Sequence, residues 1–156
     1  TLIGYFTAMD DREAFLSPKG EGERRDLAVG GVVFGMLQCA RCHPAGETVA
    51  SAASVSSTEL APSLLLAKGR LRHDWVPHWI TDPQSWVPGT RMPANFPKLD
   101  DGSFQSPLLM AIGSPQFAEQ RREMLRYFES EQDLLDYLGD VERVTGALRD
   151  HIWTLN

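Results

Sequence analysis

The sequence predicts an all-α protein. Residues 23–38 and 140–155 repeat apolar side chains every three or four positions, as one buried face of a helix requires. No stretch alternates apolar and polar residues with the period of two that is typical of a half-buried strand. A chain of 156 residues has the length of one domain and can bury a sizeable core.

The N-terminal end of the chain differs in composition from the rest. Residues 1–21 mix Gly, Asp, Pro and Glu with little periodicity and predict an N-terminal extension or linker, which leaves 22–156 as the main domain. The longest apolar run, 27–37, contains three glycines and is too short to span a bilayer. The chain begins with Thr1 and shows no signal peptide, so we expect a mature form or an excised domain.

The first half of the domain predicts two helices and two irregular segments. The helix over 23–38 buries apolar side chains at helical spacing: Leu27, Val33 or Phe34, and Leu37. Residues 44–63 are rich in Ala, Ser, Thr and Pro and predict a loop. Residues 72–80 predict a short helix with Trp75 and Trp79 on one face. Asp82-Pro83 closes it.

The second half predicts two further helices. One begins with Ser114 as N-cap and Pro115 as the first helical residue and runs to about residue 128. The last helix opens at Asp140 and turns five apolar residues inward: Val141, Val144, Leu148, Ile152 and Leu155.

The most specific motif is Cys39-Ala40-Arg41-Cys42-His43. A C-x-x-C-H string is the attachment signature of a c-type haem. Two thiols three positions apart can form thioether bonds to the two vinyl groups of one porphyrin. The histidine that follows is then held beside the iron as an axial ligand. The motif therefore predicts one haem c, bound through Cys39 and Cys42 and ligated by His43.

Two other uses of a C-x-x-C pair compete with haem attachment. A structural zinc site needs four ligands, and the remaining two would have to come from His73, His78 or His151, which lack paired metal spacing. A redox dithiol follows a buried strand in a βαβ pattern, and no such strand precedes Cys39. Both comparisons favour haem.

Charge and composition narrow the function further. The formal net charge is −6, and two haem propionates would make it more negative, so nucleic-acid binding is disfavoured. With 42% hydrophobic and 23% charged residues, the chain is an ordinary globular sequence without a transmembrane segment. If both cysteines hold haem, no thiol remains for a disulfide, and cysteine content does not indicate a compartment.

Three segments follow one another as they do in class I c-type cytochromes, and the chain resembles that family over residues 23–97 and the final helix. Gly30, Phe34 and Cys39 resemble the family's first helix, where a glycine lets the last helix cross closely and an aromatic packs beside the haem. His151 stands where the last helix of the family often has an aromatic.

The other two segments lie on either side of the predicted short helix. Ala61-Pro62-Ser63-Leu64 resembles the segment whose proline carbonyl accepts a hydrogen bond from the proximal histidine. Gly89-Thr90-Arg91-Met92-Pro93 resembles the segment that supplies the distal methionine. The resemblance implies a cytochrome c-like fold of about four to six helices around one covalent haem. Residues 98–139 would be an extra helical insert before the C-terminal helix.

The axial ligands can also be argued from their chemistry. Pro62 as hydrogen-bond acceptor would fix the tautomer of His43 and raise its basicity. Met92 is the best sixth ligand, because its thioether is a soft neutral donor in a loop bounded by Pro and Gly. His73 or His78 is the competing choice. The remaining methionines in apolar helical stretches are expected in the core: Met36, Met110 and Met124.

Several other side chains are candidates for contact with the cofactor. Phe34 is expected beside the porphyrin, and three tryptophans could pack against it: Trp75, Trp79 and Trp86. Arg91 or Arg70 could pair with a propionate. Each has an ordinary alternative, since large aromatics at helical spacing commonly form core and arginines are commonly exposed.

These residues predict an electron carrier, not an enzyme. The iron would cycle between ferric and ferrous states with both ligands bound, and electrons would pass between redox protein partners such as a membrane respiratory complex. Two alternatives remain: a domain through which electrons enter or leave a larger redox enzyme, and a gas-binding haem sensor with a labile sixth ligand. The resemblance implies a periplasmic or otherwise extracytoplasmic location, because the family acquires its haem there.

Overall fold

The computed structural model describes residues 24–45 and 61–155, and the regular structure in these ranges is helical apart from one isolated bridge between Lys98 and Phe104. The predicted extension 1–21 and most of the predicted loop 44–63 lie outside the described residues. Eight α-helices are present there: α3 (Arg24–Met36), α4 (Ala67–Arg70), α5 (Val76–Thr81), α6 (Pro83–Trp86), α7 (Leu108–Ile112), α8 (Ala118–Leu125), α9 (Glu131–Gly139) and α10 (Val141–Trp153).

The all-α prediction is confirmed, but the number of helices exceeds the expected four to six. The difference arises from short helices, since four of the eight contain only four to six residues: α4, α5, α6 and α7. Four further 3-10 turns connect them: η1 (Cys39–Arg41), η3 (Leu64–Leu66), η4 (His73–Trp75) and η5 (Pro115–Phe117). None of the helices within the described ranges is long and apolar enough to span a membrane.

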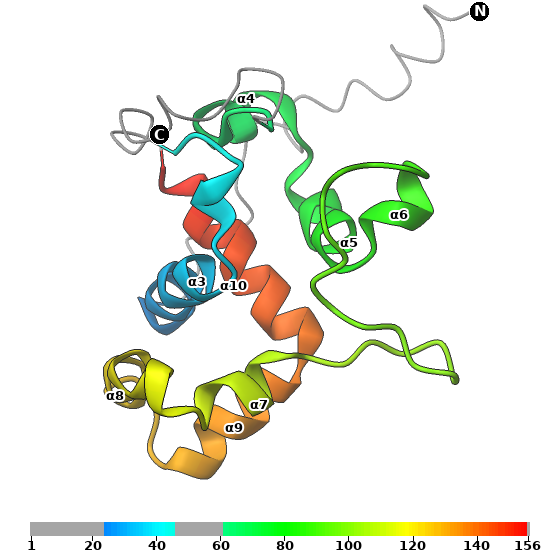
Figure 1. The fold of residues 1–156 in the computed structure, drawn as a ribbon. Helices are drawn as coiled ribbons and strands as arrows, with labels where there is room; N and C mark the ends of the chain where they lie inside the picture. The colour runs from blue at the N-terminus through cyan, green and yellow to red at the C-terminus, as the bar shows by residue number, and fades with distance from the viewer. Residues whose placement is uncertain (1–23, 46–60, 156) are drawn as a thin grey trace, which may run out of the picture.

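The two longest helices, α3 and α10, cross at the centre of the molecule (Figure 1). The α10 helix starts where it was predicted, because Asp140 accepts hydrogen bonds from the amides of Glu142 and Arg143 at 3.0 and 3.1 Å. Its inward residues are also as predicted: Val144, Leu148 and Ile152 are buried, and Val141 and Leu155 are partly buried.

A glycine allows this crossing. A Cβ atom at Gly30 would lie 2.1 Å from the carbonyl oxygen of Ala147 and 3.0 Å from the Cβ of His151. No side chain fits into that space, so the backbones of α3 and α10 are in direct contact. The ring of Phe34, one turn further along α3, lies 5.1 Å from the ring of His151. His151 therefore takes part in the crossing where an aromatic was expected.

The segment between the crossing helices follows the prediction with one difference. The predicted helix over 72–80 is present as η4 followed by α5 and ends at Thr81. Asp82-Pro83 closes that helix and also opens α6, since the side chain of Asp82 accepts from the amide of Ser85 at 3.3 Å.

Residues 98–139 enlarge the core. Six of their side chains are buried in the main hydrophobic cluster: Leu108, Ile112, Met124, Leu134, Tyr137 and Leu138. The helix predicted from Ser114 to about 128 ends at Leu125, and a separate helix, α9, begins after Ser130, whose hydroxyl accepts from the amide of Asp133 at 3.1 Å. The expectation of a core position was wrong for Met110, which is 78% exposed on α7.

The crossing leads to a first prediction. Gly30→Ala places a methyl group against the backbone of Ala147, so we expect the free energy of unfolding to fall by about 2 kcal/mol or more. Gly35→Ala, in the same helix with open space around the new Cβ, should raise it by about 0.5–1 kcal/mol. Urea unfolding followed by circular dichroism measures both, and equal effects of the two substitutions would contradict the close crossing.

A second prediction concerns pH. Burial at the crossing lowers the pKa of His151 below its ordinary value of 6.5. The unfolded chain therefore binds more protons than the folded one as the pH falls below about 6.5, and this residue's contribution to stability is lost on acidification. We expect the melting temperature of His151→Phe to fall less than that of the original protein between pH 7 and pH 5. The exposed His78 provides the control, since His78→Phe should keep the original pH dependence.

Candidate functional site

The Cys39–His43 segment forms a compact turn at the end of α3. Gln38 adopts a left-handed conformation with φ 56° and ψ 36°, which turns the chain out of the helix. The amide of His43 then donates to the carbonyl of Cys39 at 3.0 Å. Cys39 is half-buried against the core, whereas Cys42 is exposed. The two thiols thus belong to one turn of backbone with different access to solvent.

His43 is held by the segment that follows the undescribed loop. Its Nδ1 lies 2.8 Å from the carbonyl oxygen of Pro62. A carbonyl can only accept, so Nδ1 carries the hydrogen and the lone pair is on Nε2. The hydrogen bond expected between these residues is therefore present.

Backbone hydrogen bonds on both sides fix the partner segment. The amide of Ala61 donates to the carbonyl of Cys42 at 2.9 Å, and the amide of Leu64 donates to the carbonyl of Pro44 at 3.0 Å. Hydrogen bonds thus join the two segments of chain on both sides of the contact between His43 and Pro62. The ring of His43 is positioned by backbone geometry and not by a mobile side chain.

The electrostatics of Cys39 do not suit a redox dithiol. Burial, partly opposed by a backbone hydrogen bond, raises the pKa of its thiol to about 11. A reactive dithiol needs the opposite shift, because the thiolate is the nucleophile. Nor do the described residues contain a group of three or more His, Cys, Asp or Glu side chains that could hold a metal ion without a further cofactor.

Met92 lies in a loop that one glutamine side chain braces. The Nε2 of Gln84 donates to the carbonyl of Thr90 at 2.7 Å, and its Oε1 accepts from the amide of Gly89 at 3.1 Å. Gly89 has φ 81°, which other residues rarely adopt. The Met92 amide donates to the hydroxyl of Thr90 at 3.3 Å, and the Met92 side chain packs partly buried against the core.

The competing histidines have other surroundings. His73 is buried, with its Nε2 3.3 Å from a carboxylate oxygen of Asp150 and its ring against the edge of Trp153 at 5.0 Å. This pairing joins η4 to α10 and occupies one ring nitrogen. His78 is exposed on α5. His73 is thus paired inside the protein and His78 lies at the surface, whereas Met92, with which they compete as sixth ligand, is partly buried.

The three candidate tryptophans form one cluster. Trp75 and Trp79 are stacked, with centroids 5.1 Å apart and planes at 26°, and Trp86 meets Trp75 edge-on at 6.0 Å. Trp86 is half exposed, so the cluster reaches the surface. The other candidates are dispersed: Phe34 packs at the helix crossing, and Arg70 and Arg91 are exposed.

Sequence reasoning missed two residues that position this region. Gln84 was not singled out, although an amide just before a Pro-Gly loop is able to bond to a backbone donor and a backbone acceptor at once. Asp150 was not singled out either, because no sequence signal links it to His73, 77 positions earlier.

Comparisons with protein-family models, with curated protein sequences and with solved structures found no significant match to this chain.

The brace of the Met92 loop leads to a third prediction. Gln84→Leu removes both hydrogen bonds, so the Gly89 amide should exchange with solvent about fivefold to tenfold faster, as expected for the loss of about 1 kcal/mol. Gln84→Glu keeps the acceptor for Gly89 and should restore most of the protection. Hydrogen exchange followed by NMR measures this, with Gln132→Leu on α9 as the control. An unchanged Gly89 rate in Gln84→Leu would contradict the brace.

Proposed function

We propose that this chain is a monohaem c-type cytochrome that carries single electrons between redox partners. The observation that carries the proposal is the hydrogen bond between His43 Nδ1 and the Pro62 carbonyl within a C-x-x-C-H sequence. It leaves Nε2 as the ligating nitrogen and orients the ring, as outer-shell partners of metal-bound histidines do. The donor set therefore fits a haem.

Cys39 and Cys42 are the attachment residues in this proposal. Each thiol can add across one vinyl group, so that sulfur bonds to one vinyl carbon and the thiol hydrogen goes to the other. Both thiols are free in the structure, and they lie on one backbone turn that ends at His43. The half-buried Cys39 packs against the hydrophobic core, so one attachment residue lies next to the apolar side chains that a large apolar ring would need.

Met92 is proposed as the second residue, with His43, that would hold the haem iron. Its side chain is partly buried, and the side chain of Gln84 braces the backbone of Gly89 and Thr90 just before it. Haem bound there supplies an iron that gains and loses one electron. The chain's own part is to hold two neutral ligands and keep water away, which favours the ferrous state and a potential on the positive side of the haem range.

The partners and location follow from the same proposal. The donor and the acceptor are redox proteins, a membrane respiratory complex among them, and the site of action is periplasmic or otherwise extracytoplasmic. A domain of a larger redox enzyme would use the same haem site for electrons that enter or leave its catalytic part. A gas-binding sensor differs, because it requires Met92 to leave the iron open.

The fourth prediction tests haem binding. Protein produced with a bacterial haem-attachment system should gain the mass of one haem, and dithionite reduction should give a sharp α-band. The Cys39→Ala/Cys42→Ala variant should lose the covalent addition. Absence of covalent haem from the original chain would overturn the proposal and return the cysteines to the dithiol and zinc alternatives.

The ligand assignment is tested in the same material with a matched pair of methionines. Met92→Ala should abolish the weak near-infrared band of methionine-ligated ferric iron, lower the reduction potential and permit carbon monoxide binding at neutral pH. Met110→Ala, which removes an exposed thioether, should change none of these. If the original protein already binds carbon monoxide and lacks the band, the sensor alternative is favoured and Met92 is not the ligand.

A further inference from the structure

A cationic segment lies next to the turn that holds the C-x-x-C-H motif. It comprises η3, α4 and the two residues after α4, which together span 64–72. The hydrogen bond from the Leu64 amide to the Pro44 carbonyl, at 3.0 Å, joins the start of this segment to the end of the motif turn. Figure 1 shows α4 at the end of the molecule opposite α7, α8 and α9. The segment therefore lies beside the proposed haem site and away from the insert.

Helical spacing divides this segment into an inward and an outward side. Leu64, Ala67 and Leu71 face inward, since Ala67 is buried and the two leucines pack partly buried against the core. Two other leucines are exposed, by 37% at residue 65 and by 46% at residue 66. With the basic residues of the segment they form what we call the α4 surface: Leu65, Leu66, Lys68, Arg70 and Arg72.

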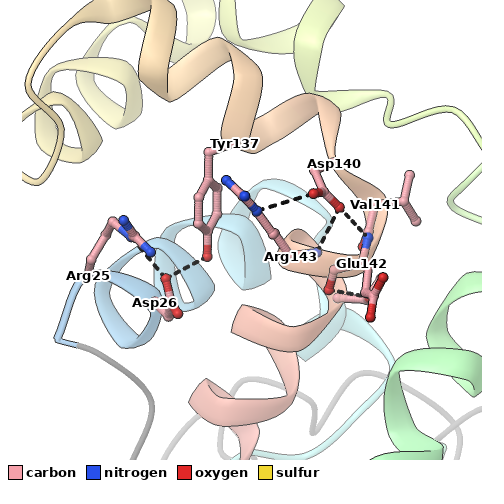
Figure 2. A network of polar contacts seen from close by, with 8 residues as sticks. Arg25, Asp26, Tyr137, Asp140, Val141, Glu142 and Arg143 are labelled. Atoms are coloured by element: carbon pink, nitrogen blue, oxygen red, sulfur yellow. Dashed lines mark hydrogen bonds and ion pairs between the residues drawn. The ribbon is translucent and has the colours of Figure 1, made fainter.

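The three cations of the α4 surface have no ionic partner among the residues that the structure describes. No Asp or Glu occurs between positions 61 and 73. The arginines at the junction of α3 and α10 differ, because Figure 2 shows them against carboxylates, with Arg25 3.1 Å from Asp26 and Arg143 3.2 Å from Asp140. The positive charge of the α4 surface is thus available to another molecule.

The two ends of the molecule carry opposite charge. The described residues 39–45 and 61–98 contain six Lys or Arg and two Asp or Glu, whereas residues 99–139 contain three Lys or Arg and eight Asp or Glu. The chain as a whole has a formal net charge of −6, so the positive end does not follow from a basic composition. An acidic surface would attract the end with the motif turn and repel the end with α7, α8 and α9.

We propose that the α4 surface is the docking site for an acidic face of a protein partner. The exposed leucines would supply apolar contact, and the three cations would meet carboxylates of the partner, in the mixture of apolar and polar contacts that protein interfaces use. The identity of this partner rests on the function proposed above, under which it is the electron donor or acceptor. The charge and the position of the surface do not depend on that function.

An anionic membrane would attract the same cations but fits the α4 surface less well. Helices that lie in a membrane interface bury an apolar face over several turns, and many are about 20–30 residues long. The α4 helix has four residues, and the α4 surface offers only two partly exposed leucines. The apolar area is therefore small for a membrane anchor, and a protein partner is favoured.

The fifth prediction tests the α4 surface with a fluorescein-labelled peptide of glutamates around a central pair of leucines, by fluorescence anisotropy at pH 7 and low ionic strength. Arg70→Glu/Arg72→Glu should weaken binding of this peptide by about fivefold or more, because attraction becomes repulsion. The control Arg122→Glu/Arg126→Glu reverses two exposed arginines in and next to α8 and gives the same net charge. It should change the affinity by less than about twofold.

Equal weakening by the two double variants would overturn the proposal, because net charge alone would then explain binding. The absence of saturable peptide binding by the original chain would also overturn it. In that case, binding to phosphatidylglycerol vesicles that Arg70→Glu/Arg72→Glu abolishes would identify the surface as a membrane contact.

Circular dichroism checks the fold of each variant. If Arg70→Glu/Arg72→Glu does not fold, Arg72→Gln and its control Arg122→Gln decide the outcome, since each removes one exposed arginine. The peptide measurement does not require haem. A chain that takes up no haem would therefore contradict the proposed function, while peptide binding would still decide whether the α4 surface is a docking site.

Discussion

The backbones of α3 and α10 touch at Gly30 and Ala147, and this contact sets where the other elements of the fold lie. It fixes α3 against α10, and the turn that holds Cys39 to His43 begins where α3 ends. On the other side of the crossing, α10 also packs against α4, α5 and α9. One pair of helices therefore positions the turn with the motif, the short helices and residues 98–139. A change at the crossing would move these parts relative to one another.

A backbone carbonyl and a side-chain amide position the segments that carry His43 and Met92. The carbonyl of Pro62 orients His43, and the amide of Gln84 shapes the loop that carries Met92. The first contact joins two segments without regular secondary structure, and the second joins such a segment to the short helix α6. Such segments keep one conformation only if their polar groups are satisfied by specific partners, because no helical ladder does so for them. The proposed ligands thus lie on irregular chain that hydrogen bonds make rigid.

The sequence was informative where the signal is local. The all-α class, the starts of α3 and α10 and the irregular segment before Met92 follow from periodicity, capping residues and Pro-Gly chemistry. The His43–Pro62 contact was anticipated only through a family resemblance. Features that depend on distant partners were missed, such as the pairing of His73 with Asp150. The separate α9 was also missed, although Leu134, Tyr137 and Leu138 have helical spacing.

The two residues in contact at the crossing are more than a hundred positions apart, so the fold brings together parts of the chain from opposite ends. Closing so long a loop carries an entropy cost that grows only with the logarithm of its length, by about 0.6 kcal/mol for each doubling. Residues 98–139 lengthen that loop without changing where its ends meet. The apolar side chains that they bury offset the added entropy cost. Chain length in this region is therefore nearly neutral for stability, whereas the geometry at the two ends of the loop has almost no room to vary.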